Sequence, residues 1–298
     1  MSFSQFCLQN SIDLKKDEIM KNHTSFKIGG KADYFVSPAN VTQLKAVIEE
    51  LKSCEIPYFI IGKGSNLLVS DNGIEGAVIS LAGFDEMSVC DNTVTVGAGA
   101  TLARLCTFAR DNSFSGLEFA YGIPGSVGGA LYMNAGAYGG EMSQVVVSAT
   151  VLKANGEIAE IDACDMALGY RTSVFKTSGD IILSASFKLE TKDSAEITAQ
   201  MDDFLSRRMD KQPLEYPSAG STFKRPVGNF AGALIEKNNF KGVSVGGAQV
   251  SAKHAGFVIN YNNATASDVL SLMQKVKETV LKNDGIELEP EVIFVGRK

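Results

Sequence analysis

The chain has 298 residues, which at about 150 residues per domain suggests roughly two domains and a sizeable buried core. Hydrophobic residues make up 45% and charged residues 21%, an ordinary globular composition that argues against disorder. Lys and Arg number 28 against 34 Asp and Glu, giving a net charge of −6. Because there is no surplus of basic charge for a phosphate backbone, we expect no nucleic-acid partner.

The cysteine and histidine content bears on compartment and metal binding. The five cysteines are scattered, odd in number and without a Cys-x-x-Cys pair, which is typical of reduced thiols in a cytosolic protein. Two histidines, His23 and His254, are too few for a His-rich metal site, and we expect His254 to be structural. The N-terminus has no apolar run for a signal peptide, and the uncharged stretch 119–140 is too rich in glycine for a membrane helix. We therefore expect a cytoplasmic monomer with no metal and no membrane partner.

The first part of the chain has the pattern of a compact α/β unit. Apolar residues spaced three and four apart, from Leu44 to Leu51, predict a helix over 41–54. The expected strands here are 32–36, 58–61 and 76–81. We place the end of this first subdomain at residue 81.

Two further blocks follow, which we expect over 82–193 and 194–298. The second block has a hairpin signal at Ala154-Asn155-Gly156. Its other expected elements are a helix over 101–110 and strands over 93–96, 145–152, 157–161 and 181–189. The third has helices over 194–208 and 230–237, and a longer one that the Thr265…Asp268 capping pattern opens and Gly285 closes. Lys211, Pro213 and Pro217 indicate a linker between the first two of these helices.

Three glycine-rich loops, at 62–66, 97–99 and 122–129, could approach a phosphate group. A single loop of this kind is usually a structural turn, but two dense loops in one α/β framework favour a nucleotide site. The usual dinucleotide fingerprint fails, because Leu67 and Leu102 stand where its third glycine should be. No P-loop sequence occurs.

Beyond the loops, several separated motifs stand out along the chain. They are 22–30 (NHTSFKIGG), 62–69 (GKGSNLLV), 122–130 (GIPGSVGGA) running on to 133–139 (MNAGAYG), 169–173 (GYRTS), 217–226 (PSAGSTFKRP) and 288–292 (LEPEV). Together, in this order and over nearly the whole chain, they resemble one family, the UDP-N-acetylenolpyruvoylglucosamine reductases.

The resemblance implies an α+β fold: an FAD-binding module of the para-cresol-methylhydroxylase type, built of two α+β subdomains, followed by an α+β substrate domain. The implied FAD contacts are Gly62, Lys63, Gly64, Ser65, Asn66, Leu67, Gly122, Ile123, Pro124, Gly125, Ser126, Gly128, Gly129 and Asn134. Neither loop contains a His or Cys for covalent attachment, so we expect noncovalent FAD.

The family's reaction assigns roles to individual residues. NADPH supplies a hydride, which reaches C3 of an enolpyruvyl group, and Ser221 matches the donor of a proton to C2. Arg171 and Glu291 match the pair that stabilises the developing enolate charge. Tyr170, Arg225 and Lys211 are the expected contacts to the UDP-sugar.

The stretch between Arg171 and Ser221 is short, so the chain resembles the class that lacks an inserted lid tyrosine. Two other readings stay open. Another FAD-dependent oxidase or dehydrogenase could use the same module, since a fold does not fix a function. A noncatalytic nucleotide-binding protein would bind FAD or UDP without reduction of the flavin by NADPH.

Overall fold

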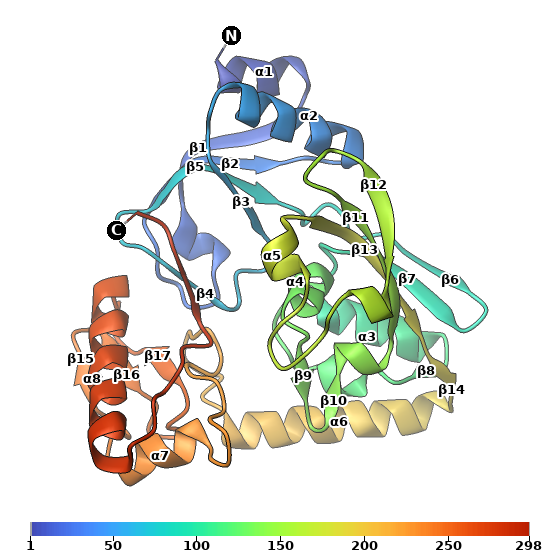
Figure 1. Ribbon diagram of the computed structural model, residues 1–298. Coiled ribbons are helices and arrows are strands. Elements are labelled where there is room, and N and C mark those ends of the chain that lie inside the picture. The colour runs from blue at the N-terminus through green and yellow to red at the C-terminus, as the bar shows by residue number, and fades with distance from the viewer. Residues whose placement is uncertain (1, 298) are drawn as a thin grey trace. The chain divides into compact units, whose positions relative to one another are not determined.

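Helices and strands of both short and ordinary length are mixed along residues 2–297, which a computed structural model describes (Figure 1). The helices are α1 (Phe3–Gln9), α2 (Val41–Ser53), α3 (Leu102–Asp111), α4 (Val127–Tyr132), α5 (Phe175–Ser178), α6 (Ser194–Lys211), α7 (Ala231–Lys237) and α8 (Ala266–Asp284), with 3-10 turns η1 (Met20–His23), η2 (Glu118–Ala120), η3 (Met142–Gln144) and η4 (Ala163–Asp165). The strands are β1 (Asp13–Ile19), β2 (Lys31–Ser37), β3 (Tyr58–Ile61), β4 (Leu67–Val69), β5 (Ile74–Ser80), β6 (Met87–Cys90), β7 (Thr93–Gly97), β8 (Phe114–Ser115), β9 (Gly136–Ala137), β10 (Gly140–Glu141), β11 (Val146–Leu152), β12 (Ile158–Asp162), β13 (Ile181–Lys188), β14 (Glu190–Thr191), β15 (Ser244–Val245), β16 (Ala248–Val250), β17 (Val258–Asn260) and β18 (Ile293–Val295).

The chain divides by its internal contacts into two compact units, each assembled from separated segments. The first unit contains the chain up to residue 15 together with 35–63 and 78–208. The second contains 16–34, 64–77 and 209–298. The three sequence domains, ending at residues 81, 193 and 298, remain a prediction.

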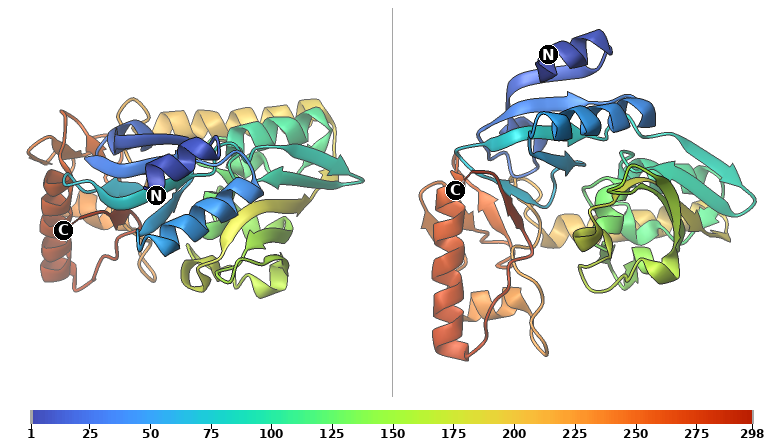
Figure 2. Two further views of the ribbon diagram at one scale, coloured as in Figure 1. Left: turned by 90° about the horizontal axis from the view of Figure 1, so that it is seen from above. Right: turned by 45° about the horizontal axis from the view of Figure 1, so that its top comes forward.

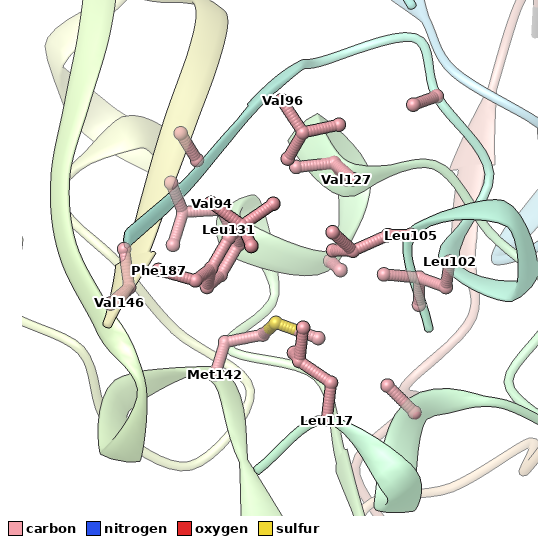
Figure 3. Close-up of a cluster of buried hydrophobic side chains, with 14 of the residues drawn as sticks. Val94, Val96, Leu102, Leu105, Leu117, Val127, Leu131, Met142, Val146 and Phe187 are labelled. Carbon is pink, nitrogen blue, oxygen red and sulfur yellow. The ribbon is translucent and has the colours of Figure 1, made fainter. Parts of the chain in front are cut away.

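The largest sheet lies in the first unit and has the order β12-β11-β13-β7-β6. Its neighbours pair antiparallel, and the β11–β12 hairpin turns at Gly156, whose φ of +88° is readily available to glycine. Figure 3 shows side chains of this sheet packed against α3 and α4. The labelled core residues are Val94, Val96, Leu102, Leu105, Leu117, Val127, Leu131, Met142, Val146 and Phe187. A second sheet has the strand order β1-β2-β5-β3.

In the second unit, α8 packs on the three-stranded sheet β15-β16-β17 (Figures 1 and 2). Thr265 and Asp268 form the reciprocal capping box at its start, and Gly285, with φ +68°, ends it. The apolar stripe that the sequence predicts is buried in the core of this unit: Val269, Leu272, Met273, Val276 and Val280. A separate parallel pair joins β4 to β18.

Most predicted elements are confirmed within two or three residues. Lys211 was expected in a linker but is the last residue of α6, because this helix continues three residues beyond the predicted end at Arg208. The polar N-terminal sequence does not predict α1, which begins with a capping box between Ser2 and Gln5. Short strands such as β4 and β18 were also not predicted, because three residues show no clear alternation.

Candidate active site

The two long glycine loops touch each other in the first unit. A Cβ added to Gly62 would lie 2.1 Å from the Oγ of Ser126, so only glycine lets the loops approach this closely. Ser126 also caps α4 by accepting the N–H of Gly129. Neither 62–69 nor 122–129 contains an acidic side chain. Glycine loops that contain no acidic side chain suit the pyrophosphate of FAD.

The third glycine loop supports the second one. The N–H of Gly128 donates to the carbonyl of Ala98 at 2.9 Å, and a Cβ on Gly128 would lie 2.9 Å from the Ala98 Cβ. The N–H of Leu102 donates to the carbonyl of Gly125 at 3.1 Å. The 97–102 segment therefore holds the 122–129 loop in place, which gives its glycines a structural role.

Arg171 lies in a tight turn of the same unit. Gly169 and Thr172 exchange backbone hydrogen bonds of 3.1 and 3.2 Å, and Arg171 between them has φ +55°. The guanidinium donates to the carbonyl of Gly136 at 3.5 Å and lies 5.2 Å from the centre of the Tyr170 ring. Tyr170 itself is 53% exposed. The turn thus presents a cation and an aromatic ring together.

The side chain of Asn134 holds the turn that carries Arg171. Its side chain is fully buried, with Nδ2 donating to the Gly169 carbonyl at 3.0 Å and Oδ1 accepting the N–H of Ser143 at 2.9 Å. Both ends of its amide therefore bond to the protein backbone. Its expected contact with FAD stays a prediction.

In the second unit, the segment around Ser221 pairs with the segment around Glu291. Phe223 and Pro290 form an antiparallel bridge. The N–H of Glu291 donates to the Thr222 carbonyl at 2.9 Å, and the N–H of Lys224 donates to the Glu289 carbonyl at 2.8 Å. The exposed Ser221 is therefore next in the chain to Thr222, the residue whose carbonyl binds the half-buried Glu291.

Thr222 anchors this pairing in the core. It is 2% exposed, and its N–H donates to the Gly256 carbonyl at 2.9 Å. Its Oγ1 accepts the N–H of Val258 at 2.8 Å. The N–H, the carbonyl and the hydroxyl oxygen of Thr222 thus all form hydrogen bonds, which fixes the backbone next to Ser221. Thr222 lies in the middle of the PSAGSTFKRP motif, but the motif alone predicts no role for it.

The end of the first glycine loop also belongs to the second unit. Gly64 has φ +59°, and a Cβ there would lie 2.2 Å from the carbonyl oxygen of His23. This contact gives the 22–30 motif a structural role, because His23 supports the loop through its backbone. Asn66 follows, and its carbonyl accepts the N–H of Ile293 at 2.9 Å.

The remaining expected substrate contacts in this unit are exposed cations. The Arg225 guanidinium lies 4.5 Å from the centre of the Phe230 ring, which holds the charge in place. Lys211 ends α6. Among residues 2–297, no group of three or more His, Cys, Asp or Glu side chains could hold a metal ion, and no helix is long and apolar enough to cross a membrane.

Burial shifts the ionisation of two groups in the first unit near these loops. It lowers the pKa of Arg208, although the charge of Tyr138 acts in the opposite direction; the Arg208 Cδ lies against Gly122. Burial also raises the pKa of Tyr132, whose carbonyl accepts the Ser173 hydroxyl. Both side chains are partly withdrawn from water beside the predicted site residues.

Two family models match separate parts of the chain. One, described as an FAD binding domain, matches residues 32–162, and the other, described as the C-terminal domain of UDP-N-acetylenolpyruvoylglucosamine reductase, matches 212–295. Together with the glycine loops, these matches define the class of protein as an FAD-dependent oxidoreductase of α+β fold. The predicted FAD-binding module with a separate C-terminal domain is confirmed.

The chain belongs to the UDP-N-acetylenolpyruvoylglucosamine reductase family. It is 50% identical to the enzyme of that name from Agathobacter rectalis, with 96% of this chain and 95% of that protein covered. It is 49% identical to the one from Clostridium novyi, over 96% and 93% of the two chains. The crystal structure of the Thermus caldophilus reductase matches with a TM-score of 0.82 at 33% identity, covering 95% and 98%.

Proposed function

We propose that this enzyme reduces the enolpyruvyl group of UDP-N-acetylglucosamine enolpyruvate to UDP-N-acetylmuramate, with NADPH as the hydride donor, in peptidoglycan precursor synthesis. The family membership supports the reaction. One structural observation supports the chemistry most directly: the backbone bond between Thr222 and Glu291, which brings the Ser221 and Glu291 segments together.

Gly62, Gly64, Gly122 and Gly125 would hold the pyrophosphate of FAD through backbone N–H groups. The N–H groups of Gly128 and Gly129 donate to Ala98 and Ser126, so these two glycines would serve by letting the cofactor approach the backbone closely. Bound FAD would supply the hydride-transfer chemistry between NADPH and C3 of the enolpyruvyl group. Lys63 is exposed at the first loop and adds a positive charge for the phosphates.

Ser221 donates its hydroxyl proton to C2 of the substrate, which forms the new C2–H bond. A serine hydroxyl is a weak acid, but a carbanion-like C2 is a strong base, so a well-placed hydroxyl is sufficient. Arg171 offers a planar, permanently charged set of donors to the substrate carboxylate, which gains charge in the transition state. Glu291 acts on the same developing charge as Arg171.

Tyr170, Arg225 and Lys211 bind the UDP-sugar in this proposal. Arg225 and Lys211 are exposed cations that suit a diphosphate, and the exposed ring of Tyr170 suits an apolar face of a sugar or base. We also place the enzyme in the cytoplasm as a monomer without a nucleic-acid partner, in keeping with its reduced cysteines and net charge of −6.

An anaerobic visible spectrum of the purified protein tests the proposal. Flavin bands should bleach with NADPH and return on addition of the enolpyruvyl substrate. Bands that bleach and stay bleached, but return with oxygen, would instead support a different flavin oxidase. Protein that takes up no FAD would overturn the assignment.

A further inference from the structure

The side chain of Asn66 reaches across the second unit to the segment that carries Glu291. Its Nδ2 donates to the carbonyl oxygen of Glu291 at 3.1 Å, between residues 225 positions apart in the chain. The backbone carbonyl of Asn66 accepts the N–H of Ile293 at 2.9 Å. One residue of the glycine loop therefore bonds on both sides of Val292.

Both backbone polar groups of Glu291 are consequently occupied. Its N–H donates to Thr222 at 2.9 Å, and its carbonyl accepts from Asn66 at 3.1 Å. A residue held at both ends cannot rotate its peptide groups freely, so the direction of its Cα–Cβ bond is set. The segment after Glu291 continues into β18, which pairs with β4 in parallel register from Ile293 opposite Leu67.

Glu291 thus lies where the chain changes partners. Before it, Pro290 pairs with Phe223 in antiparallel fashion; after it, Ile293 pairs with Leu67 in parallel fashion. The Glu291 carbonyl lies between these two pairings, and it accepts a hydrogen bond from the side chain of Asn66. A half-buried carbonyl without a partner would cost free energy and would leave this junction loose.

We propose that Asn66 is a positioning residue for Glu291: its side-chain amide fixes the backbone of Glu291, so the loop that binds the FAD pyrophosphate also sets the place of the catalytic carboxyl group. This inference rests on the catalytic role proposed above for Glu291. Asn66 would then have two functions: the expected contact with FAD, and the placing of Glu291 for reduction of the enolpyruvyl substrate.

The chemistry of the contact explains why asparagine is required. Aspartate has the same size but would place an oxygen against the carbonyl oxygen, which repels it. Alanine has no donor, and serine ends one bond short of the Nδ2 position. Each of these side chains should release the Glu291 backbone even if the glycine loop keeps its course.

A double-mutant cycle tests the proposal on the FAD-loaded enzyme. The variants are Asn66→Ala, Asn66→Asp, Glu291→Gln and the two double variants, each studied at saturating FAD. Two single-turnover rates are measured anaerobically: bleaching of the flavin by NADPH, and return of the flavin bands with the enolpyruvyl substrate. The control is Asn238→Ala, which removes an amide-to-carbonyl bond of 2.9 Å to Leu234 in the same unit, together with the bonds of this side chain to Asp284 and Asn283.

We expect each Asn66 variant to slow the substrate half-reaction by about 10- to 100-fold, within the range of coupling measured between contacting residues. Bleaching by NADPH should stay within about threefold of the parent, and Asn238→Ala should leave both rates unchanged within the same factor. In the Glu291→Gln background, the Asn66 changes should add less than about threefold, because the group that they misplace is already gone.

The failures are separable. If Glu291→Gln leaves the substrate half-reaction intact, the proposed role of Glu291 fails. If Glu291→Gln slows it and the Asn66 losses multiply in full, only the positioning role fails. If neither Asn66 variant binds FAD even at saturation, or if both half-reactions slow equally, Asn66 serves the cofactor and the positioning role is overturned.

Discussion

The two groups of predicted site residues are built in different ways. In the first unit, the loops are fixed by glycine backbones in close contact, such as Gly62 against Ser126 and Gly128 against Ala98. In the second unit, a hydrogen bond of Thr222 joins the Ser221 segment to the distant Glu291 segment, and the side chain of Asn66 joins the glycine loop to Glu291. The first kind of site depends on the absence of side chains, and the second on particular polar ones. The two should therefore fail in different ways when they are mutated.

The largest expected effect concerns the chemistry in the second unit. Ser221→Ala should lower turnover by about 10²- to 10⁴-fold, the usual contribution of a proton donor. Flavin content and bleaching by NADPH should remain, because the change removes only the hydroxyl. Stopped-flow measurement of each half-reaction checks this, and unimpaired substrate turnover would remove Ser221 from the mechanism.

A smaller effect tests the close packing in the first unit. Gly128→Ala should destabilise the protein by about 2 kcal/mol and weaken FAD binding, because its Cβ would overlap Ala98. Gly129→Ala is the control, since its Cβ would meet only the Ser126 Oγ at 3.3 Å. Denaturant unfolding of both variants gives the comparison, because FAD binding is expected to weaken in both: each glycine is a predicted FAD contact. Equal losses of stability would show that Ala98 is not the cause.

Loss of one hydrogen bond in the second unit should have a similar or slightly smaller effect. Thr222→Val removes the acceptor of the buried Val258 N–H and should cost about 1–2 kcal/mol of stability. Thr222→Ser keeps the hydroxyl and should cost clearly less. Denaturant unfolding measures both, and activity should fall more in the valine variant because Ser221 is next in the chain. Equal stability of the two variants would argue against the hydrogen bond.

The smallest effect is a pH dependence within the second unit. Burial lowers the pKa of His254 from its ordinary value of 6.5, and Lys241 acts the same way, whereas its backbone hydrogen bond and Glu236 oppose the shift. The unfolded chain therefore takes up this proton at higher pH than the folded one, so stability is full above pH 6.5 and declines as the pH falls below it. His254→Gln should flatten this decline in thermal melts between about pH 5 and 7. A decline of unchanged slope would assign it to other groups.

The sequence predicts local features of this protein well and long-range ones poorly. Helix α8 is predicted because its cap, its apolar stripe and Gly285 are all within the helix or next to it. The loops at 62–66 and 122–129 are predicted for the same reason. No local signal shows that Asn66 bonds to Glu291 or that β4 pairs with β18, because the partners are about 225 residues apart.

The predicted roles of single residues divide in the same way. Arg171, Ser221 and Glu291 are identified only through the motifs around them, since each alone resembles an ordinary loop residue. The supporting role of Thr222 is invisible in the sequence because threonine at a buried bridge has no distinguishing spacing. Asn134 shows the opposite case, where both ends of a motif residue's amide bond to the protein backbone.

The bond between Asn66 and Glu291 also has a consequence for synthesis of the protein. The ribosome makes Asn66 225 residues before Glu291, which at about 5–20 residues per second is a delay of about 11–45 s. During that time the glycine loop exists without the segment that it holds. A chain released early would carry the loops and Ser221 but not Glu291, so on the role proposed for Glu291 the enzyme becomes active only when translation is almost finished.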